Sequence, residues 1–482
     1  MSRLSPLKSR LDIRSGRYHT ERPGGRAMRP SDRTSVDTVM ASSSTTERSY
    51  DGNAMPPATK EGTEIHVRPT SPLVGVRRLK QQARPTRSSV PVFCFALLFG
   101  VLLSFSPVSG QAQSASSGTV PFVLDGNRVY ARVEFITPEG TSRKALVFVD
   151  LGSPSMILSK DLYAELGVGS NKTLGLRIGE MTISMESADV TNDAWLPFSI
   201  GQDRKVEALL PAGVLQQYQV RFDYADHTMT LAQPATLRLQ GAVVPLRLNP
   251  KTGLSSIETK IDGKIYPITI DNGSGYTWIR MPAAKDWFLR HPDWQRGIGA
   301  VGPSNMRMAD DGIETTGTLV RIAEIKLGSM SIRQVGALAI APDDHGHDFM
   351  DWYSTKNAVP VIGWLGGNVL RHYRITLDYP RQMSYWERQS ALDSHDLDYV
   401  GLTLLFRHGE YYVGQIAARG GRPTVTGIQV GDKLVQVGKL RTYGASRDAL
   451  FAAMHGKPEV VRQLIVERDG RLFHINASVT AF

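Results

Sequence analysis

The sequence predicts a mostly β protein, built from two similar lobes and a smaller β-rich domain. Short runs of β-branched and aromatic residues alternate with Gly, Asn and Asp turns after residue 118. One strand-and-turn pattern occurs twice, as Val147–Ser153 and as Ile268–Ser274. A third unit begins near Val400 and ends in two strand-like runs joined by Asp469-Gly470, which is a strong hairpin signal.

The first part of the chain is a basic leader. Residues 1–89 hold 17 Lys and Arg against 8 Asp and Glu, a surplus of nine out of the net charge of +10. This stretch is rich in Arg, Ser, Thr and Pro without apolar periodicity, so we expect it to be disordered. The rest of the chain is almost neutral, which removes the main argument for a nucleic-acid partner.

An uncharged apolar run follows the leader, from Val90 to Phe105, and ends in the small residues Ser109-Gly110-Gln111-Ala112. This pattern is typical of a secretory signal, here residues 90–112 with cleavage near Ala112. The alternative is an uncleaved membrane anchor through residues 90–108. The only cysteine, Cys94, lies inside this run, so the exported body has no disulfide or Cys-based zinc site. We expect a periplasmic protein, or one anchored to the inner membrane and facing the periplasm.

An internal repeat divides the next part of the chain. The stretch Val214–Tyr224 recurs as Val369–Tyr379, at an offset of 155 residues. Each copy lies downstream of one Asp-x-Gly-Ser turn. The repeat therefore predicts two lobes, residues 119–235 and 241–390, before the third unit at 400–482.

Few helices are predicted, and all of them are short. Ser159 is placed to cap a helix over Lys160–Leu166, which Gly167 would end. Asp286–Arg290 is a second short candidate. Ser446 is expected to cap a helix that runs to Met454.

The two repeated turns carry the candidate chemistry, through Asp150 and Asp271. Two carboxyl groups about 3 Å apart cannot both ionise, so they share one proton. One then takes a proton from water while the other donates a proton to a carbonyl oxygen. Each turn also contains a glycine, which permits the close approach, and a serine that is placed to orient the carboxylate: Gly152 and Ser153, Gly273 and Ser274.

Residues 119–390 resemble two fused retropepsin-like lobes, a pepsin-like bilobal arrangement within one chain. The stretch Val147–Ser153 resembles the catalytic turn of that family. The stretch Val361–Leu370 resembles its hydrophobic-Gly segment, with Gly363 as the glycine that supports the site. The resemblance implies an aspartic peptidase that hydrolyses polypeptides without a cofactor or metal.

Residues 400–482 resemble a PDZ domain, and the stretch Gly401-Leu402-Thr403-Leu404 matches the PDZ loop that binds a carboxyl terminus through backbone N–H groups. Gly431-Asp432 matches the Gly-Asp turn of that family. The whole layout is similar to bacterial exported aspartic peptidases with a trailing PDZ domain. The resemblance implies peptide or protein C-termini as partners.

Two functions stay open because of the residue that follows each aspartate. The family usually has Thr or Ser there, and its hydroxyl helps to lock the two lobes together, whereas this chain has Leu151 and Asn272. The first hypothesis is an exported aspartic endopeptidase. The alternative is a catalytically lapsed, PDZ-containing protein that binds peptides or acts as a scaffold.

Other features are interpreted as structural. Asp343–Asp348 contains two histidines but has no partner ligands at a recognisable spacing, so we expect a solvated loop. Trp287, Phe288 and Trp294 are expected to pack a helix on its sheet. Asp310-Asp311-Gly312 is interpreted as a hairpin tip, with a flap over the cleft as the alternative. The sequence has no serine-hydrolase elbow, P-loop or dinucleotide fingerprint.

Overall fold

The computed structural model describes residues 115–194, 196, 198–200, 204–343, 346 and 348–482. The basic leader, the apolar run at 90–112 and Cys94 therefore lie outside the described residues, as do Asp344, His345 and His347. Within the part that is described, no helix is both long and apolar enough to cross a membrane.

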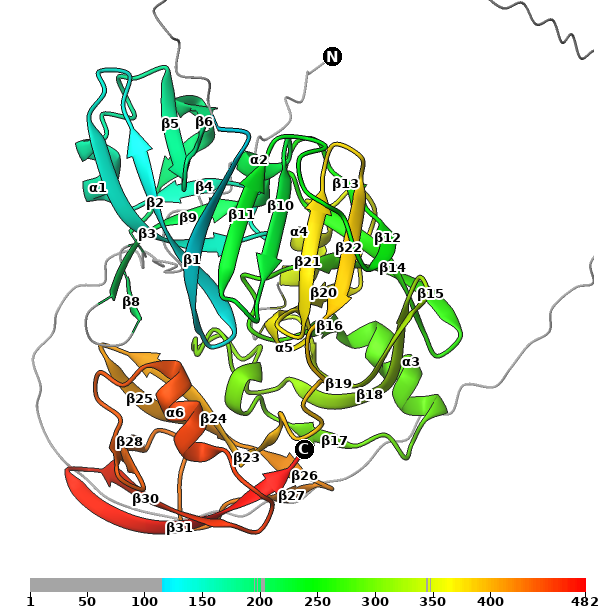
Figure 1. Ribbon diagram of the computed structural model, residues 1–482. Coiled ribbons are helices and arrows are strands. Elements are labelled where there is room, and N and C mark those ends of the chain that lie inside the picture. Colours follow the sequence, from blue (N-terminus) through cyan, green and yellow to red (C-terminus); the bar gives the residue numbers. More distant parts are fainter. Residues whose placement is uncertain (1–114, 195, 197, 201–203, 344–345, 347) are drawn as a thin grey trace, which may run out of the picture. The chain divides into compact units, whose positions relative to one another are not determined.

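The prediction of a mostly β fold is confirmed, and the strands form three sheets (Figure 1). We call residues 117–232 the first lobe, residues 242–388 the second lobe and residues 398–482 the C-terminal domain. Hydrophobic side chains fill the core between and beneath the sheets, and the largest buried ones include Trp278, Trp287 and Trp386.

The first lobe forms most of the largest sheet and carries two short helices. Its strands are β1 Ser117–Asp125, β2 Arg128–Ile136, β3 Ser142–Asp150, β4 Met156–Leu158, β5 Thr173–Ile178, β6 Met181–Glu186, β7 Val190–Asn192, β8 Phe198–Ile200, β9 Arg204–Pro211, β10 Gln219–Asp223 and β11 Thr228–Ala232. Its helices are α1 Lys160–Glu165 and α2 Ala212–Leu215, with a 3₁₀ turn, η1, at Ser187–Asp189. Ser159 caps α1 by accepting a bond from Leu162 N, as predicted.

The second lobe adds three strands to that sheet and builds a second sheet of its own. Its strands are β12 Ala242–Pro245, β13 Arg247–Leu248, β14 Ser255–Ile261, β15 Lys264–Ile270, β16 Trp278–Arg280, β17 Arg296–Ile298, β18 Thr318–Leu327, β19 Met330–Ile340, β20 Gly363–Leu365, β21 Tyr373–Asp378 and β22 Met383–Arg388. Its helices are α3 Met281–Arg290, α4 Phe349–Ser354 and α5 Gly367–Leu370, with a 3₁₀ turn, η2, at Gly302–Ser304. Helix α3 is longer than the predicted Asp286–Arg290, and Trp287 on it is fully buried.

The internal repeat has a clear structural meaning. Each copy consists of a short helix followed by a strand, α2 with β10 in the first lobe and α5 with β21 in the second. The two repeated strands pair with each other, antiparallel, with Phe222 opposite Ile375. This pairing joins the two lobes within the 14-stranded sheet. In each lobe the short repeated helix therefore leads directly into one strand of this shared pair.

The C-terminal domain is a separate sheet with one helix. Its strands are β23 Asp398–Val400, β24 Leu402–Arg407, β25 Glu410–Ile416, β28 Lys433–Val437, β29 Leu440–Arg441, β30 Val461–Arg468 and β31 Arg471–Ala481. Two shorter strands, β26 Ala418–Arg419 and β27 Arg422–Pro423, extend the sheet of the second lobe through β17. Helix α6 Arg447–Met454 is capped by Ser446, and Asp469 and Gly470 both have positive φ in the hairpin between β30 and β31, as the sequence predicted.

Candidate active site

The two candidate aspartates occupy equivalent places in the two lobes. Asp150 is the last residue of β3, which runs parallel to β9. Asp271 directly follows β15, which runs parallel to β20. In both lobes the parallel neighbour leads into the short repeated helix, α2 or α5. Strand, turn and supporting neighbour are therefore repeated, although the sequence of β9 retains little of the hydrophobic-Gly pattern found in β20.

The two carboxyl groups lie against each other. A Cβ atom added at Gly152 would collide with the Asp271 carboxyl group, and one added at Gly273 would collide with that of Asp150. Each turn therefore needs glycine because the aspartate of the other lobe fills the space where a side chain would start. The two carboxyl groups are also close enough to share a hydrogen bond.

The two carboxyl groups differ in their hydrogen bonds. Asp271 accepts three bonds, from Gly273 N at 2.9 Å, Ser274 N at 3.1 Å and Ser274 Oγ at 2.9 Å. Asp150 accepts a bond from Gly152 N at 2.9 Å. Hydrogen bonds to a carboxylate favour its charged form, so this arrangement stabilises the negative charge on Asp271 more than on Asp150.

Ser153 and Ser274 do not play the same part, although they are equivalent in sequence. Ser274 donates to Asp271, as expected. The Ser153 hydroxyl donates to the Ser155 carbonyl at 3.2 Å and does not orient Asp150 in this structure. The expected symmetry of the two serines is therefore wrong, because the chain after Ser153 bends back and offers a backbone acceptor.

Burial and the neighbouring charge shift both acids in the same direction. Burial, followed by the negative charge of Asp271, raises the pKa of Asp150 well above its usual value. Burial also raises the pKa of Asp271, against the opposing effect of the Ser274 and Gly273 donors. The pair is therefore suited to hold one proton on Asp150 while Asp271 is ionised. Asp150 is half-buried, whereas Asp271 is almost fully buried.

Asn272 provides a bond between the lobes that sequence reasoning missed. Its side-chain Oδ1 accepts a hydrogen bond from Leu151 N at 2.9 Å. Both residues are buried, and the Leu151 side chain belongs to the main hydrophobic core. Asn272 thus joins the aspartate turn of the second lobe to that of the first, although only one of the two turns supplies a side chain.

Gly363 supports the site through a close backbone approach. It begins β20, next to β16, and a Cβ there would collide with the Trp278 carbonyl oxygen. Glycine is thus required where β20 packs between β16 and β15, the strand that leads to Asp271. Asn127 adds a further support, since its Nδ2 donates to the Gly275 carbonyl at 3.1 Å.

The predicted peptide-binding residues lie in the C-terminal domain, away from solvent. Gly401, Leu402, Thr403 and Leu404 are all buried. The backbone N–H of Leu404 donates to Asn305 Oδ1 of the second lobe at 2.7 Å. The structure therefore does not bring these residues together with the aspartates, and the chain itself covers them.

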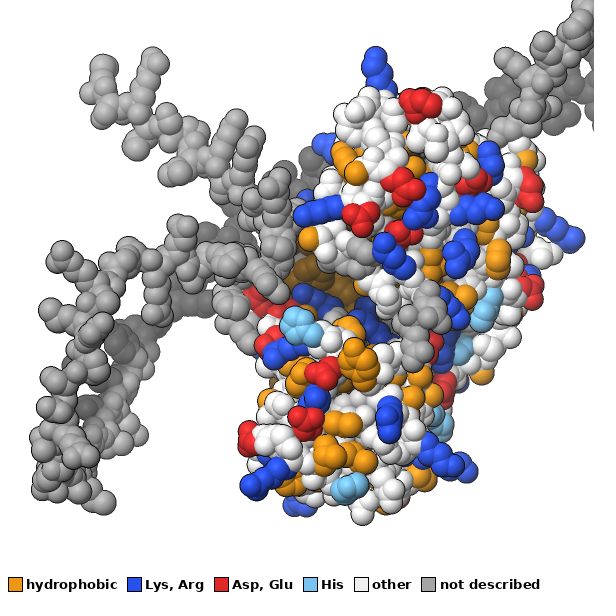
Figure 2. Space-filling view, turned by 90° about the vertical axis from the view of Figure 1, so that its left-hand side faces the viewer, with side chains coloured by type: hydrophobic (Ala, Val, Ile, Leu, Met, Phe, Trp, Pro, Cys, Tyr) orange, Lys and Arg blue, Asp and Glu red, His pale blue; other side chains and the backbone are white. Residues whose placement is uncertain are grey.

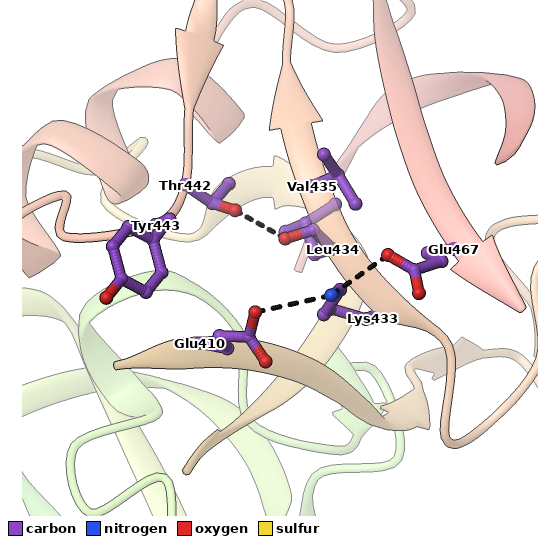
Figure 3. Close-up of a pocket in the computed structure, with 7 residues that line it drawn as sticks. All are labelled: Glu410, Lys433, Leu434, Val435, Thr442, Tyr443 and Glu467. Carbon is purple, nitrogen blue, oxygen red and sulfur yellow. Dashed lines mark hydrogen bonds and ion pairs between the residues drawn. The ribbon is translucent and has the colours of Figure 1, made fainter. Parts of the chain in front are cut away.

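A small pocket of about 120 Å³ lies elsewhere on the C-terminal domain (Figure 3). Lys433 Nζ lies 3.2 Å from Glu410 Oε1 and 2.9 Å from Glu467 Oε2. Lys433 thus pairs with both acids, and the three side chains together keep one net negative charge. Hydrophobic side chains are also visible in the lower half of Figure 2. The exposed hydrophobic residues of the C-terminal domain include Val430, Val461 and Leu472.

Among the residues that the structure describes, no group of three or more His, Cys, Asp or Glu side chains is arranged to hold a metal. In the Asp343–Asp348 loop, Asp348 caps α4 by accepting a bond from Asp351 N.

The comparisons with known proteins add little. No protein-family model matches this chain, and no curated protein matches it. Among solved structures, the chain is similar to the crystal structure of Basic 7S globulin from soybean. The match covers 58% of this chain and 96% of that chain, with 11% identity and a TM-score of 0.34. A likeness at this level carries no argument, so the candidate function depends on the site itself.

Proposed function

We propose that the protein is an exported aspartic endopeptidase. The observation that carries the proposal is the contact between the carboxyl groups of Asp150 and Asp271, each fixed on a turn that only glycine allows. Two carboxyl groups held in contact have a specific chemical use, because they keep one proton between them at a pH where isolated aspartates are ionised.

The hydrogen bonds assign a role to each acid. Ionised Asp271 takes a proton from a water molecule held between the two carboxyl groups, and the water oxygen attacks the carbonyl carbon of a peptide bond. Asp150 donates its proton to the carbonyl oxygen, which gives a neutral tetrahedral intermediate. Transfer of the proton from Asp271 to the amide nitrogen then allows the C–N bond to break and the amine to leave. Asp150 regains a proton from one hydroxyl group of the intermediate, whose oxygen becomes the carbonyl oxygen of the new carboxyl group.

The proposed substrate is a polypeptide. Covalent linkage of the two lobes keeps the aspartates together without a second chain, and the C-terminal domain is proposed to bind peptide or protein C-termini. Export to the periplasm, with or without an anchor at residues 90–108, remains part of the proposal. No cofactor, metal or nucleic acid is required by this chemistry.

Replacement of each aspartate by asparagine tests the proposal. Asp150→Asn and Asp271→Asn are each expected to abolish hydrolysis of a denatured protein substrate, because either change removes the shared proton while preserving side-chain shape. Circular dichroism should show that both variants are folded. Hydrolysis at the wild-type rate by both single variants would refute the proposal.

The alternative is a catalytically lapsed protein that binds peptides with the same parts. Leu151 favours it, since this residue has no hydroxyl with which to fix the opposite lobe. In that case the wild-type protein binds peptides but cleaves none between about pH 3 and 7, the range in which a carboxylate pair is active. Binding without cleavage by the wild-type protein would select this alternative.

A further inference from the structure

The edge strand of the C-terminal domain is already occupied by the chain itself. Strand β24 is the last strand on its side of the sheet, so its outer N–H groups have no strand partner there. Two of them are bonded to the second lobe, Leu404 N to Asn305 Oδ1 at 2.7 Å and Phe406 N to Met308 O at 2.9 Å. Residues 302–308, which we call the inner segment, therefore lie along β24.

The inner segment is also buried on its other side. Its first part, η2, contacts helix α6. The side chains of Met306 and Met308 are buried in one hydrophobic cluster with Leu404 of β24 and Leu450 of α6. Apolar residues two positions apart, together with backbone acceptors, are what an extended peptide offers when it adds to the edge of a sheet.

A buried acid fixes the shape of this segment. Glu314 accepts bonds from Asn305 Nδ2 at 3.0 Å, Arg307 N at 2.8 Å and Met308 N at 2.7 Å. These bonds hold the segment in place from the side of the second lobe. The segment is therefore a built contact, which the second lobe presents to β24.

Met306 connects the same segment to both lobes and to the candidate site. Its carbonyl accepts bonds from Arg128 Nη2 of the first lobe at 3.0 Å and from Arg447 Nη1 of α6 at 2.5 Å. Its Sδ accepts the backbone N–H of Tyr276 at 3.0 Å. Tyr276 lies two residues after Ser274, which orients Asp271. A movement of the inner segment would therefore break the bond to Tyr276 and shift the backbone next to the Asp271 turn.

We propose that the inner segment is an internal ligand of β24, so that an extended peptide with apolar residues at alternate positions docks on the C-terminal domain only by displacing it. The effect on hydrolysis rests on the function proposed above, whereas the occupancy of β24 does not. Displacement loosens the Met306 contacts and slows catalysis, so the docked segment is the active state.

Two variants separate the inner segment from its surroundings. Met308→Asp places a charge in the hydrophobic cluster and should drive the segment off β24. Asp310→Asn is the matched control, because it removes only an exposed ion pair between the same loop and Arg407. The pairing of Asp310 with Arg407 of β24 also shows that this turn contacts the C-terminal domain.

Hydrogen exchange of residues 402–407 in the full chain tests the occupancy of β24. Met308→Asp should make exchange in this stretch about tenfold faster or more, whereas Asp310→Asn should leave it unchanged. Unchanged exchange in Met308→Asp would overturn the proposal, because the inner segment would then not be what protects these amides.

Peptide binding is tested in the full chain carrying Asp150→Asn, so that cleavage does not interfere. The probe is a fluorescent synthetic peptide with the sequence of residues 303–310. It should bind about tenfold more tightly, or more, after Met308→Asp, because the tethered segment otherwise competes at a high effective concentration. Equal binding with and without Met308→Asp, or no binding by either protein, would overturn the proposal.

Hydrolysis of a short peptide substrate provides the last readout, in proteins that retain both aspartates. Met308→Asp should lower kcat, and Asp310→Asn should not. An undiminished kcat in Met308→Asp would overturn the link to the catalytic turn. If the wild-type protein hydrolyses nothing, the proposed function fails, while the exchange and binding experiments still decide whether β24 is occupied.

Discussion

Replacement of Asn272 by alanine isolates the bond that joins the two aspartate turns. The change removes the Oδ1 acceptor and leaves the buried N–H of Leu151 without a partner. An unsatisfied buried N–H costs about 1–3 kcal/mol. The Nδ2 of Asn272 is itself buried without a hydrogen-bond partner among the described residues, so its loss should offset part of that cost. We therefore expect the free energy of unfolding to fall by about 1–2 kcal/mol.

The same change should also affect catalysis, because the bond sets the distance between the two aspartate turns. A misplacement of reacting groups by about 1 Å can lower the rate about 100-fold. Asn272→Thr is the matched variant, since its hydroxyl also offers an acceptor, one bond closer to the main chain than Oδ1, and it should recover part of both losses. Urea unfolding and hydrolysis of a peptide substrate measure the two effects. If Asn272→Ala has the stability and the kcat of the wild type, the bond does not hold the site.

Three further predictions concern the aspartate pair and its surroundings. Because the folded-state pKa of Asp150 is raised, its contribution to stability is present below pH 3.8 and is lost as the pH rises through the raised value. Asp150→Asn should therefore raise the melting temperature near pH 7, with a gain that shrinks toward pH 4. An equal gain at every pH would contradict this pKa shift. Gly152→Ala should abolish hydrolysis in a folded protein, because its Cβ pushes Asp271 away. Normal kcat would show that the carboxyl groups do not need contact. Tyr276→Phe removes a hydroxyl that donates to partly buried Asp396 at 3.0 Å, so urea unfolding should show a loss of about 1–3 kcal/mol. No loss would mean that Asp396 finds another donor.

Local sequence signals predicted the features that depend on neighbouring residues. The Ser159 and Ser446 caps and the hairpin at Asp469-Gly470 are set by a few residues each, and the structure contains all three. The mostly β fold followed from strand-like runs and turn residues. The repeat placed Asp150 and Asp271 at the ends of equivalent strands, because strand order is preserved in both copies.

Contacts between distant residues could not be predicted in the same way. The bond from Leu151 to Asn272 joins residues 121 positions apart, and nothing in either local sequence indicates it. Ser153 and Ser274 have identical contexts in the pattern, but the following backbone gives them different partners. The position of the inner segment on β24 depends on Glu314, a buried side chain of the second lobe that no local sequence signal connects to β24.

The central claim is that the aspartate pair activates water, and a single assay of hydrolysis tests it most directly. Residues 113–482 are incubated with a denatured protein between about pH 3 and 7, with and without a pepstatin-type inhibitor. We expect cleavage within that range, lost in the presence of the inhibitor, because the inhibitor takes the place of the activated water between Asp150 and Asp271. The absence of cleavage throughout that range, from a protein shown to be folded, would contradict the claim.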